Sequence, residues 1–397
     1  MKRLRCLYVD VPFENESGGD KNRSRFLWQA LRAAFDTDLV LVQREAANAG
    51  RPAFSRFPPA LTLTPVRGPW HHSDSVFGFD QTALAAFDAV LERNRFDVVV
   101  GRFHSPWNLL RRAAAQPAGP AVVMDLDMVS SRLVALTWQQ QPSFKNRWFL
   151  FEKLKLERLE RQIARQPFLV LFSNPEELKS FDRRCHSHGS RSTLATLPNV
   201  MPTLPPVAEV ALQPVILFFG SMNSSANTDG FTFLVEQLLP RLDGDLRRAG
   251  VKIHVVGRNP PGWFADRIRA AGTDRIVLVG GVDSMERAIA ESRFVLLPLR
   301  VASGTRTRIL EAAAQARAVV TTPIGAEGIE VGDAALVHAE PDKLAEAVRR
   351  LVFDSAAAAQ LGARLRERCL ERYAADRVAA ELVREIGAFT ANRRART

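Results

Sequence analysis

Short apolar segments alternate with helical segments along almost the whole of this sequence. An apolar segment without polar alternation is typical of a strand that is buried on both faces, and such strands pair in parallel when helices separate them. We therefore predict an α/β fold whose parallel sheets are covered by helices. The strands are expected near residues 4–9, 38–42, 97–100, 121–124 and 168–172, then from residue 215 and near residues 251–256, 276–279, 295–297, 319–321 and 335–337.

A proline-rich segment, residues 197–206, lacks periodicity and separates the two sets of predicted strands. A chain of 397 residues is long enough for two domains that each bury a core. The prediction is two doubly wound, Rossmann-like domains that face a central cleft, comprising residues 1–200 and residues 207–397. Ligands of such sheets bind beyond the carboxyl ends of the strands, so candidate site residues are expected in the loops at those ends.

The composition predicts a globular protein of the cytoplasm. Hydrophobic residues make up 46% of the chain, and no apolar run approaches the roughly 20 residues that a membrane-spanning helix needs. The first residues are typical of a strand rather than of a signal peptide. The cysteines, Cys6, Cys185 and Cys369, are scattered, so neither a disulfide framework nor a Cys-x-x-Cys zinc site is expected.

The net charge of +11 indicates an acidic partner. Nucleic acid, anionic lipid and a phosphorylated substrate are the candidates, and no nucleic-acid-binding motif is recognisable. Aromatic and basic residues interleave in residues 144–165, a pattern typical of a helix that contacts a membrane surface. Leu154, Leu156, Leu159 and Ile163 also fit a stripe that faces the protein core, so a buried helix with a solvated basic face is the alternative.

Residues 294–311 carry the strongest indication of a binding site. A predicted strand, residues 294–297, is ended by Pro298, and a turn then leads into a helix. The N-terminus of a helix offers unpaired N–H groups and partial positive charge to a phosphate, and arginines add fixed charge. Glu311 lies where it can accept hydrogen bonds from ribose hydroxyls. The residues predicted to bind a nucleoside diphosphate here are Arg300, Ser303, Gly304, Thr305, Arg306, Arg308 and Glu311.

A second glycine-rich loop, residues 323–329, follows the neighbouring predicted strand. One Gly-Thr-Arg turn by itself would more often be an ordinary strand-to-helix connection with solvated arginines. Two such loops from neighbouring strands favour a site, because their backbones meet at the same edge of the sheet.

Residues 280–329 resemble the nucleotide-sugar half of the group 1 GT-B glycosyltransferases, also called family 4. The resemblance rests on Pro298-Leu-Arg300, Ser303-Gly-Thr-Arg306, the basic Arg308, Ile309-Leu-Glu-Ala312 and Gly325-Ala-Glu-Gly328. It implies a GT-B fold in which Glu311 binds the ribose of the donor. The family's first acidic residue of this motif is replaced by Ser303.

The strand from Val215 to Gly220 looks like the opening strand of the same donor domain, which places Gly220 beside the donor. Many members have an arginine and a lysine after that glycine, where this chain has Met222 and Asn227. The resemblance is therefore to a branch in which the later arginines carry the phosphate charge. Arg258, after the next strand, is either a further cation of the site or an ordinary surface arginine.

In the first domain, Gly18 and Gly19 resemble the family's Gly-Gly loop, which lies against the donor diphosphate and the acceptor. A flexible turn before a helix cap is the alternative. At the end of the strand near residues 121–124, Asp127 or Asp125 occupies the region where the family frequently has a histidine near the anomeric carbon of the donor sugar, and Asp127 is the predicted catalytic residue. His104, after the preceding strand, is the other candidate catalytic residue. A structural role in hydrogen bonding is its alternative.

The resemblance implies a retaining glycosyltransferase that moves a sugar from a nucleotide-diphosphate sugar to a glycan or lipid-linked acceptor. Bacterial surface polysaccharide synthesis at the inner face of the membrane is the expected setting. No metal and no cofactor besides the donor is expected, because arginines and backbone amides can stabilise the leaving diphosphate. Two alternatives remain: a catalytically inactive GT-B subunit that binds a nucleotide sugar or a partner, and a nucleotide-sugar epimerase or hydrolase.

Overall fold

The computed structural model describes residues 3–11, 18–43, 58–67, 73, 76–140, 148–185, 189–202, 210–301 and 306–395. The chain divides into two compact units: residues 1–199 with 376–397, and residues 200–375. The division falls at the proline-rich segment. The last helix of the chain belongs with the first unit.

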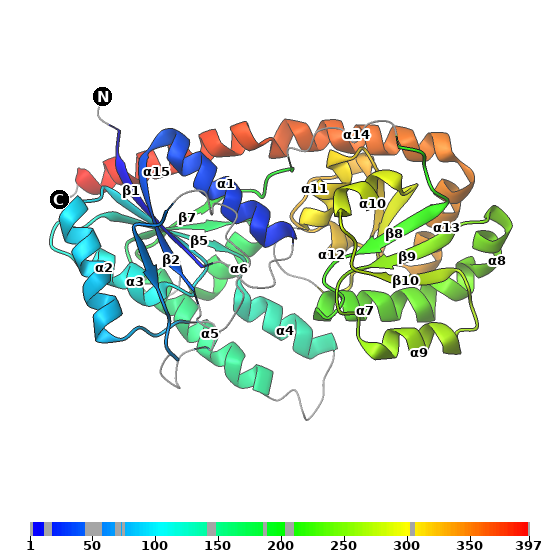
Figure 1. Ribbon diagram of the computed structural model, residues 1–397, viewed down its shortest axis with the longest axis horizontal. Coiled ribbons are helices and arrows are strands. Elements are labelled where there is room, and N and C mark those ends of the chain that lie inside the picture. Colours follow the sequence, from blue (N-terminus) through cyan, green and yellow to red (C-terminus); the bar gives the residue numbers. More distant parts are fainter. Residues whose placement is uncertain are drawn as a thin grey trace. The chain divides into compact units, whose positions relative to one another are not determined.

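The first unit is a parallel sheet of seven strands in the order β3-β2-β1-β4-β5-β6-β7, with helices on both sides (Figure 1). Its strands are β1 (Arg5–Asp10), β2 (Asp36–Val42), β3 (Leu61–Leu63), β4 (Val98–Arg102), β5 (Ala121–Asp127), β6 (Phe168–Phe172) and β7 (Thr193–Thr196). Its helices are α1 (Gly18–Ala34), α2 (Gln81–Asn94), α3 (Trp107–Ala114), α4 (Ser130–Gln140), α5 (Trp148–Ala164), α6 (Pro175–Cys185) and α15 (Ala375–Arg394).

The core of this unit consists of the apolar strands β1, β4, β5 and β6, whose residues are buried along nearly their whole length. The two edge strands β3 and β7 are not among the strands predicted from the sequence. Each is short and partly exposed, so neither has the continuous apolar run that marks a central strand. Near the end of the chain, Arg393 donates to the Gly119 carbonyl oxygen at 3.2 Å and Arg394 pairs with Asp97, which attaches α15 to this unit.

The second unit is a parallel sheet of six strands in the order β10-β9-β8-β11-β12-β13. Its strands are β8 (Val215–Phe219), β9 (Lys252–Val256), β10 (Ile276–Gly280), β11 (Phe294–Leu297), β12 (Ala318–Thr321) and β13 (Leu336–Val337). Its helices are α7 (Ser225–Phe233), the π-helical η2 (Leu234–Leu238), α8 (Leu239–Ala249), α9 (Gly262–Ala270), α10 (Met285–Glu291), α11 (Thr307–Ala314), α12 (Pro323–Ala326), the 3-10 helix η3 (Gly332–Ala334), α13 (Pro341–Phe353) and α14 (Ser355–Tyr373). All six strands agree with the sequence prediction to within a few residues.

Both sheets reverse their winding direction once, between β1 and β4 in the first unit and between β8 and β11 in the second. At such a switch point the loops after the two neighbouring strands run to opposite faces of the sheet and leave room for a ligand between them. The carboxyl ends of these strand pairs are therefore the expected binding positions in each unit.

No helix among the described residues is long and apolar enough to cross a membrane. Helix α5 nevertheless exposes large apolar side chains, with exposed fractions of 53% for Trp148, 62% for Phe151 and 58% for Leu154. Leu156, Leu159 and Ile163 of the same helix are buried. The stripe predicted to face the core is therefore correct for these three residues and wrong for Leu154, which lies on the exposed face with the aromatic residues.

Candidate functional site

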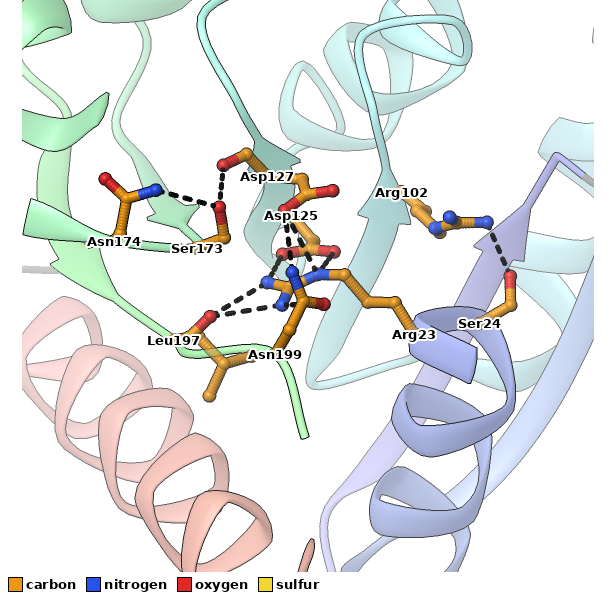
Figure 2. Close-up of polar contacts among 9 residues, drawn as sticks. All are labelled: Arg23, Ser24, Arg102, Asp125, Asp127, Ser173, Asn174, Leu197 and Asn199. Carbon is orange, nitrogen blue, oxygen red and sulfur yellow. Dashed lines mark hydrogen bonds and ion pairs between the residues drawn. The ribbon is translucent and has the colours of Figure 1, made fainter. Parts of the chain in front are cut away.

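In the first unit, buried charged residues gather at the carboxyl ends of β4 and β5 (Figure 2). Arg23 of α1 is 2% exposed and Asp125 of β5 is fully buried. The guanidinium donates from Nε to Asp125 Oδ2 at 2.8 Å and from Nη2 to Oδ1 at 2.5 Å. Burial opposes the charge on Arg23, but Asp125 and Asp127 outweigh it and raise the pKa of the guanidinium above its usual value. The pair is therefore a fixed, two-pronged ion pair inside the unit.

Arg23 also holds the segment that follows β7. Its Nη1 and Nη2 both donate to the Leu197 carbonyl oxygen at 3.1 Å, and Nη1 donates to Asn199 Oδ1 at 3.1 Å. The side chain of Asn199 in turn donates to Asp127 Oδ1 at 3.5 Å. One buried arginine thus fixes the end of β5 and the segment after β7 in one network.

Asp127 occupies a strained position at the end of β5. Its φ angle of 64° is unusual for a residue other than glycine, and the pairing of β5 with β6 shifts register between Asp125 and Asp127. Ser173 Oγ donates to the Asp127 carbonyl oxygen at 2.8 Å, which supports this conformation (Figure 2). Backbone strain that the surroundings hold in place is concentrated at functional sites.

A second buried network lies at the end of β1. Ser24 Oγ donates to both carboxylate oxygens of Asp10 at 3.0 Å, and Tyr8 donates to Asp10 Oδ1 at 3.2 Å. Arg102 Nη1 donates to Ser24 Oγ at 2.7 Å and lies 4.0 Å from Asp10 Oδ1. Burial raises the pKa of Asp10, against the opposing effect of Arg102. In this network the positive charge of Arg102 balances the negative charge of Asp10, at the switch point between β1 and β4.

His104 follows β4 and is 8% exposed. Its Nε2 has no hydrogen-bond partner among the described residues. Burial lowers the pKa of the imidazole to about 4, so the ring is neutral at pH 7. A neutral imidazole with a buried, unsatisfied nitrogen can donate to or accept from a hydroxyl group.

In the second unit, Gly220 ends β8 with a φ angle of 145°, which side chains rarely tolerate. A Cβ atom there would lie 2.7 Å from Asn227 Nδ2 and 2.9 Å from Arg308 Nη1. Arg308 reaches this turn from α11 and donates from Nη1 to the Phe219 carbonyl oxygen at 2.8 Å and to Asn227 Oδ1 at 2.7 Å. The structure therefore brings Gly220 and Arg308 together at the switch point.

Arg300 follows β11 and is paired with a residue that the sequence reasoning did not assign to the site. Its Nη2 and Nε donate to Asp229 Oδ1 and Oδ2 at 2.7 and 3.1 Å. The guanidinium also lies over the ring of Phe233, with its central carbon 4.8 Å from the ring centroid. Asp229 stands in α7, and the Asn-Thr-Asp-Gly sequence gives no indication of its partner.

Arg306 precedes α11 and is 6% exposed. Its Nε donates to the Ile324 carbonyl oxygen at 3.1 Å, which ties the start of α11 to α12. Gly325 in α12 has no room for a side chain, because a Cβ atom would lie 2.1 Å from Thr321 Oγ1. Gly325 is therefore packed closely against the ends of β11 and β12.

Glu311 lies three residues after Arg308 in α11 and is partly buried. Burial raises the pKa of this carboxyl group to about 7, while Arg308 acts in the opposite direction. Arg258 is exposed after β9, and its side chain runs past Gly281, where a Cβ atom would lie 3.1 Å from Arg258 Cγ. The structure thus brings Gly220 and Arg308 together at the end of β8, with Glu311 one turn from Arg308 in α11, and places Arg258 beside the loop that follows β10.

Several predicted residues have no side-chain description. Ser303, Gly304 and Thr305 lie outside the described residues, and Gly18 and Gly19 are the first residues of α1. The donor-binding role of all the predicted residues and the catalytic role of Asp127 and His104 stay predictions.

Comparison with known proteins finds similarity in fold over the chain and a family match within the second unit. Residues 213–354 match the family described as Glycosyl transferases group 1. Sucrose-phosphate synthase of Thermosynechococcus elongatus is 17% identical, with a TM-score of 0.68 over 97% of this chain and 100% of that chain. WaaG, a glycosyltransferase involved in lipopolysaccharide biosynthesis, is 16% identical, with a TM-score of 0.66 over 96% and 99%. HepE of Anabaena, in complex with UDP and glucose, is 15% identical, with a TM-score of 0.64 over 97% and 99%.

No curated protein matches the sequence. The two sheets of parallel strands and these likenesses confirm the predicted GT-B fold. The resemblance to group 1 glycosyltransferases is likewise confirmed, by the family match over residues 213–354.

Proposed function

We propose that this chain is a retaining glycosyltransferase that uses a nucleotide-diphosphate sugar. The proposal starts from its GT-B fold and from the match of residues 213–354 to the group 1 glycosyltransferases. The observation that carries the proposal is the position of Arg308 against Gly220 at the switch point of the second unit, with Glu311 on the same helix. A cation at a glycine turn suits a diphosphate, and a carboxylate one turn away suits a ribose.

The first unit would bind the acceptor. The neutral imidazole of His104 has an unsatisfied Nε2 that a hydroxyl group of an acceptor or of the transferred sugar would satisfy. Asp127 would stabilise positive charge that develops on the sugar ring as the bond to the diphosphate breaks. In a retaining reaction on one face of the sugar, the departing phosphate takes the proton of the acceptor hydroxyl, so the protein supplies little general-base catalysis.

The charge on the leaving diphosphate would be stabilised by arginines and backbone amides of the second unit, without a metal ion or a further cofactor. A UDP-linked sugar is one candidate donor, because HepE of Anabaena has been solved in complex with UDP and glucose.

The acceptor would be a glycan or a lipid-linked sugar in bacterial surface polysaccharide synthesis. WaaG, which shares the fold, is involved in lipopolysaccharide biosynthesis. Helix α5 gives this setting a physical basis, because Trp148, Phe151 and Leu154 form an exposed apolar face and Lys155 Nζ lies 4.9 Å from the Trp148 ring centroid. Aromatic and basic side chains together suit the interface of an anionic membrane.

The first test is calorimetric titration of the purified protein with UDP, GDP and ADP. We expect one of them to bind and Glu311→Ala to weaken that binding by roughly 10- to 100-fold, as for a lost hydrogen bond to a charged group. Glu346→Ala, which removes an exposed glutamate of α13, is the matched control and should retain the affinity of the parent. Absence of binding by the parent, or equal binding by Glu311→Ala, would contradict the proposed donor site.

The second test is turnover of the matching nucleotide sugar with and without a glycan acceptor. Release of the nucleoside diphosphate that depends on the acceptor, with the anomeric configuration retained in the product, is the expected result. Donor turnover without any acceptor would instead identify an epimerase or a hydrolase. Donor binding without turnover under any condition would identify an inactive binding subunit.

A further inference from the structure

Two arginines of the second unit stand at the carboxyl ends of its central strands, and helix α7 holds them in different ways. Arg300, after β11, is paired with the carboxylate of Asp229 at 2.7 and 3.1 Å. Among the described residues, the oxygens that accept hydrogen bonds from Arg308 are both uncharged: the Phe219 carbonyl at 2.8 Å and the Asn227 amide at 2.7 Å. Asn227 and Asp229 lie two residues apart in α7.

This difference sets the charge at each arginine. The side chain of Asp229 is 7% exposed, so its carboxylate faces Arg300 rather than water and largely cancels the charge of that guanidinium. No ion pair joins Arg308 to an acidic residue of the described part of the chain, although Glu311 is near enough to influence its pKa. Burial lowers the pKa of Arg308 to about 10, which leaves the group protonated at pH 7. Net positive charge therefore remains at Arg308.

Asn227 is fixed in one orientation. It is 1% exposed, its Nδ2 donates to the Ser221 carbonyl oxygen at 2.7 Å, and its Oδ1 accepts from Arg308. An aspartate at this position would direct a carboxylate oxygen at the Ser221 carbonyl and would cancel the charge of Arg308. The amide is thus the group that can hold Arg308 at the Gly220 turn and leave its charge for a ligand.

We infer that Arg308 is the principal cation for the donor diphosphate, that Asn227 is its positioning residue, and that Arg300 is a structural arginine neutralised by Asp229. The inference rests on the proposed function, and it divides the roles of arginines that the sequence treats alike. It also accounts for Asn227 at a position where many group 1 members have a lysine: the cation comes from α11, and α7 supplies its neutral support.

The test compares two nearly isosteric substitutions, Asn227→Asp and Asp229→Asn, which change the local charge in opposite directions. Calorimetry measures the binding of UDP, GDP and ADP and of the nucleosides uridine, guanosine and adenosine. For the nucleotide that the parent binds, we expect Asn227→Asp to lower the affinity by about tenfold or more, as for one charge-assisted contact. Binding of the matching nucleoside should change by less than about twofold, because it has no phosphate. Asp229→Asn should not weaken diphosphate binding.

The outcomes separate this inference from the proposed function. If the parent binds none of the three nucleotides, both are wrong. If the parent binds one and Asn227→Asp binds it equally well, or loses nucleoside and diphosphate binding alike, only the role of Asn227 is refuted. If Asp229→Asn weakens diphosphate binding as much as Asn227→Asp, the division of roles between the arginines is refuted. Thermal unfolding of both variants accompanies the titrations, so that a loss of folded protein is not taken for a loss of affinity.

Discussion

Replacing Arg23 by methionine should be among the most destabilising single changes in the first unit. The methionine fills much of the space of the arginine stem but provides no hydrogen-bond donor. Asp125 would then be a carboxylate with no solvent exposure and no cation, and the Leu197 and Asn199 oxygens would lose the donor that now reaches them at 3.1 Å.

Removing one partner of a buried ion pair costs about 3 to 5 kcal/mol, because the remaining charge is left in a poorly solvating interior. Folded domains are stable by roughly 5 to 15 kcal/mol. The substitution should therefore remove about a fifth or more of the stability of a typical domain. Replacing both partners together is different, because apolar residues of similar volume need no compensation. The Arg23→Met, Asp125→Leu double variant should regain more than half of the loss.

Urea unfolding followed by circular dichroism measures the free energies of the parent, both single variants and the double variant. Hydrogen exchange detected by mass spectrometry then locates the change, which should be concentrated at the end of β5 and in residues 197–199. A loss below about 1 kcal/mol for Arg23→Met would refute the reasoning, because it is the size expected of an exposed pair. A double variant less stable than either single variant would refute it as well.

Three further predictions concern pH and the exposed face of α5. Glu160 is 3% exposed, and burial raises the pKa of its carboxyl group from 4.5 to about 7. Between these two pH values the folded state binds more protons than the unfolded state, so the free energy of unfolding falls as the pH rises from 5 to 7.5. Glu160→Gln should reduce this pH-dependent loss of stability by about 3 kcal/mol in urea unfolding measured across the pH range. Burial lowers the pKa of His104 from 6.5 to about 4, so the free energy of unfolding falls as the pH drops from 7 to 4. His104→Phe should reduce this loss of stability by about 3 kcal/mol in the same assay. A pH dependence of stability that is unchanged in Glu160→Gln or in His104→Phe would contradict the burial argument. The double variant Phe151→Glu, Leu154→Glu should bind phosphatidylglycerol vesicles at least tenfold more weakly in co-sedimentation, with phosphatidylcholine vesicles as the control. Each change removes an exposed apolar side chain whose burial in lipid would contribute about 2 kcal/mol to the free energy of binding. Equal vesicle binding by this variant would show that α5 is not the contact.

The sequence was sufficient to predict the fold because both sheets depend on strands that are buried on both faces. Strands such as β6 and β11 consist of apolar residues only, so their positions are evident without any knowledge of their neighbours. The edge strands β3 and β7 were missed for the same reason. Each is short and partly exposed, so neither has a continuous apolar run, whereas the edge strands β10 and β13 of the second sheet consist largely of apolar residues and were predicted.

The candidate site was predicted only in part. Gly220, Arg308 and Glu311 follow a local pattern of strand, turn and helix, and the structure brings Gly220 and Arg308 together at the end of β8 with Glu311 one turn away in α11. Arg23 and Asp229 were not assigned, because their importance comes from partners far away in the sequence. Arg23 meets Asp125 across 102 positions, and Asp229 meets Arg300 across 71. Ordinary spacing rules, which describe neighbours on one helix or strand, cannot indicate such pairs.

The charges at the end of β5 support the proposal that Asp127, rather than Asp125, is the carboxylate that acts on the sugar ring. Arg23 forms two short hydrogen bonds with Asp125, whereas its Nε lies 3.9 Å from Asp127 Oδ1. One guanidinium can balance only one carboxylate, so the pair of aspartates leaves one negative charge in excess. The left-handed backbone at Asp127, with a φ angle of 64°, keeps that excess charge at the end of the strand, where the side chain remains 12% exposed. A fixed carboxylate at the mouth of a buried and otherwise neutral network is the electrostatic arrangement that a transition state with positive charge on a sugar ring requires.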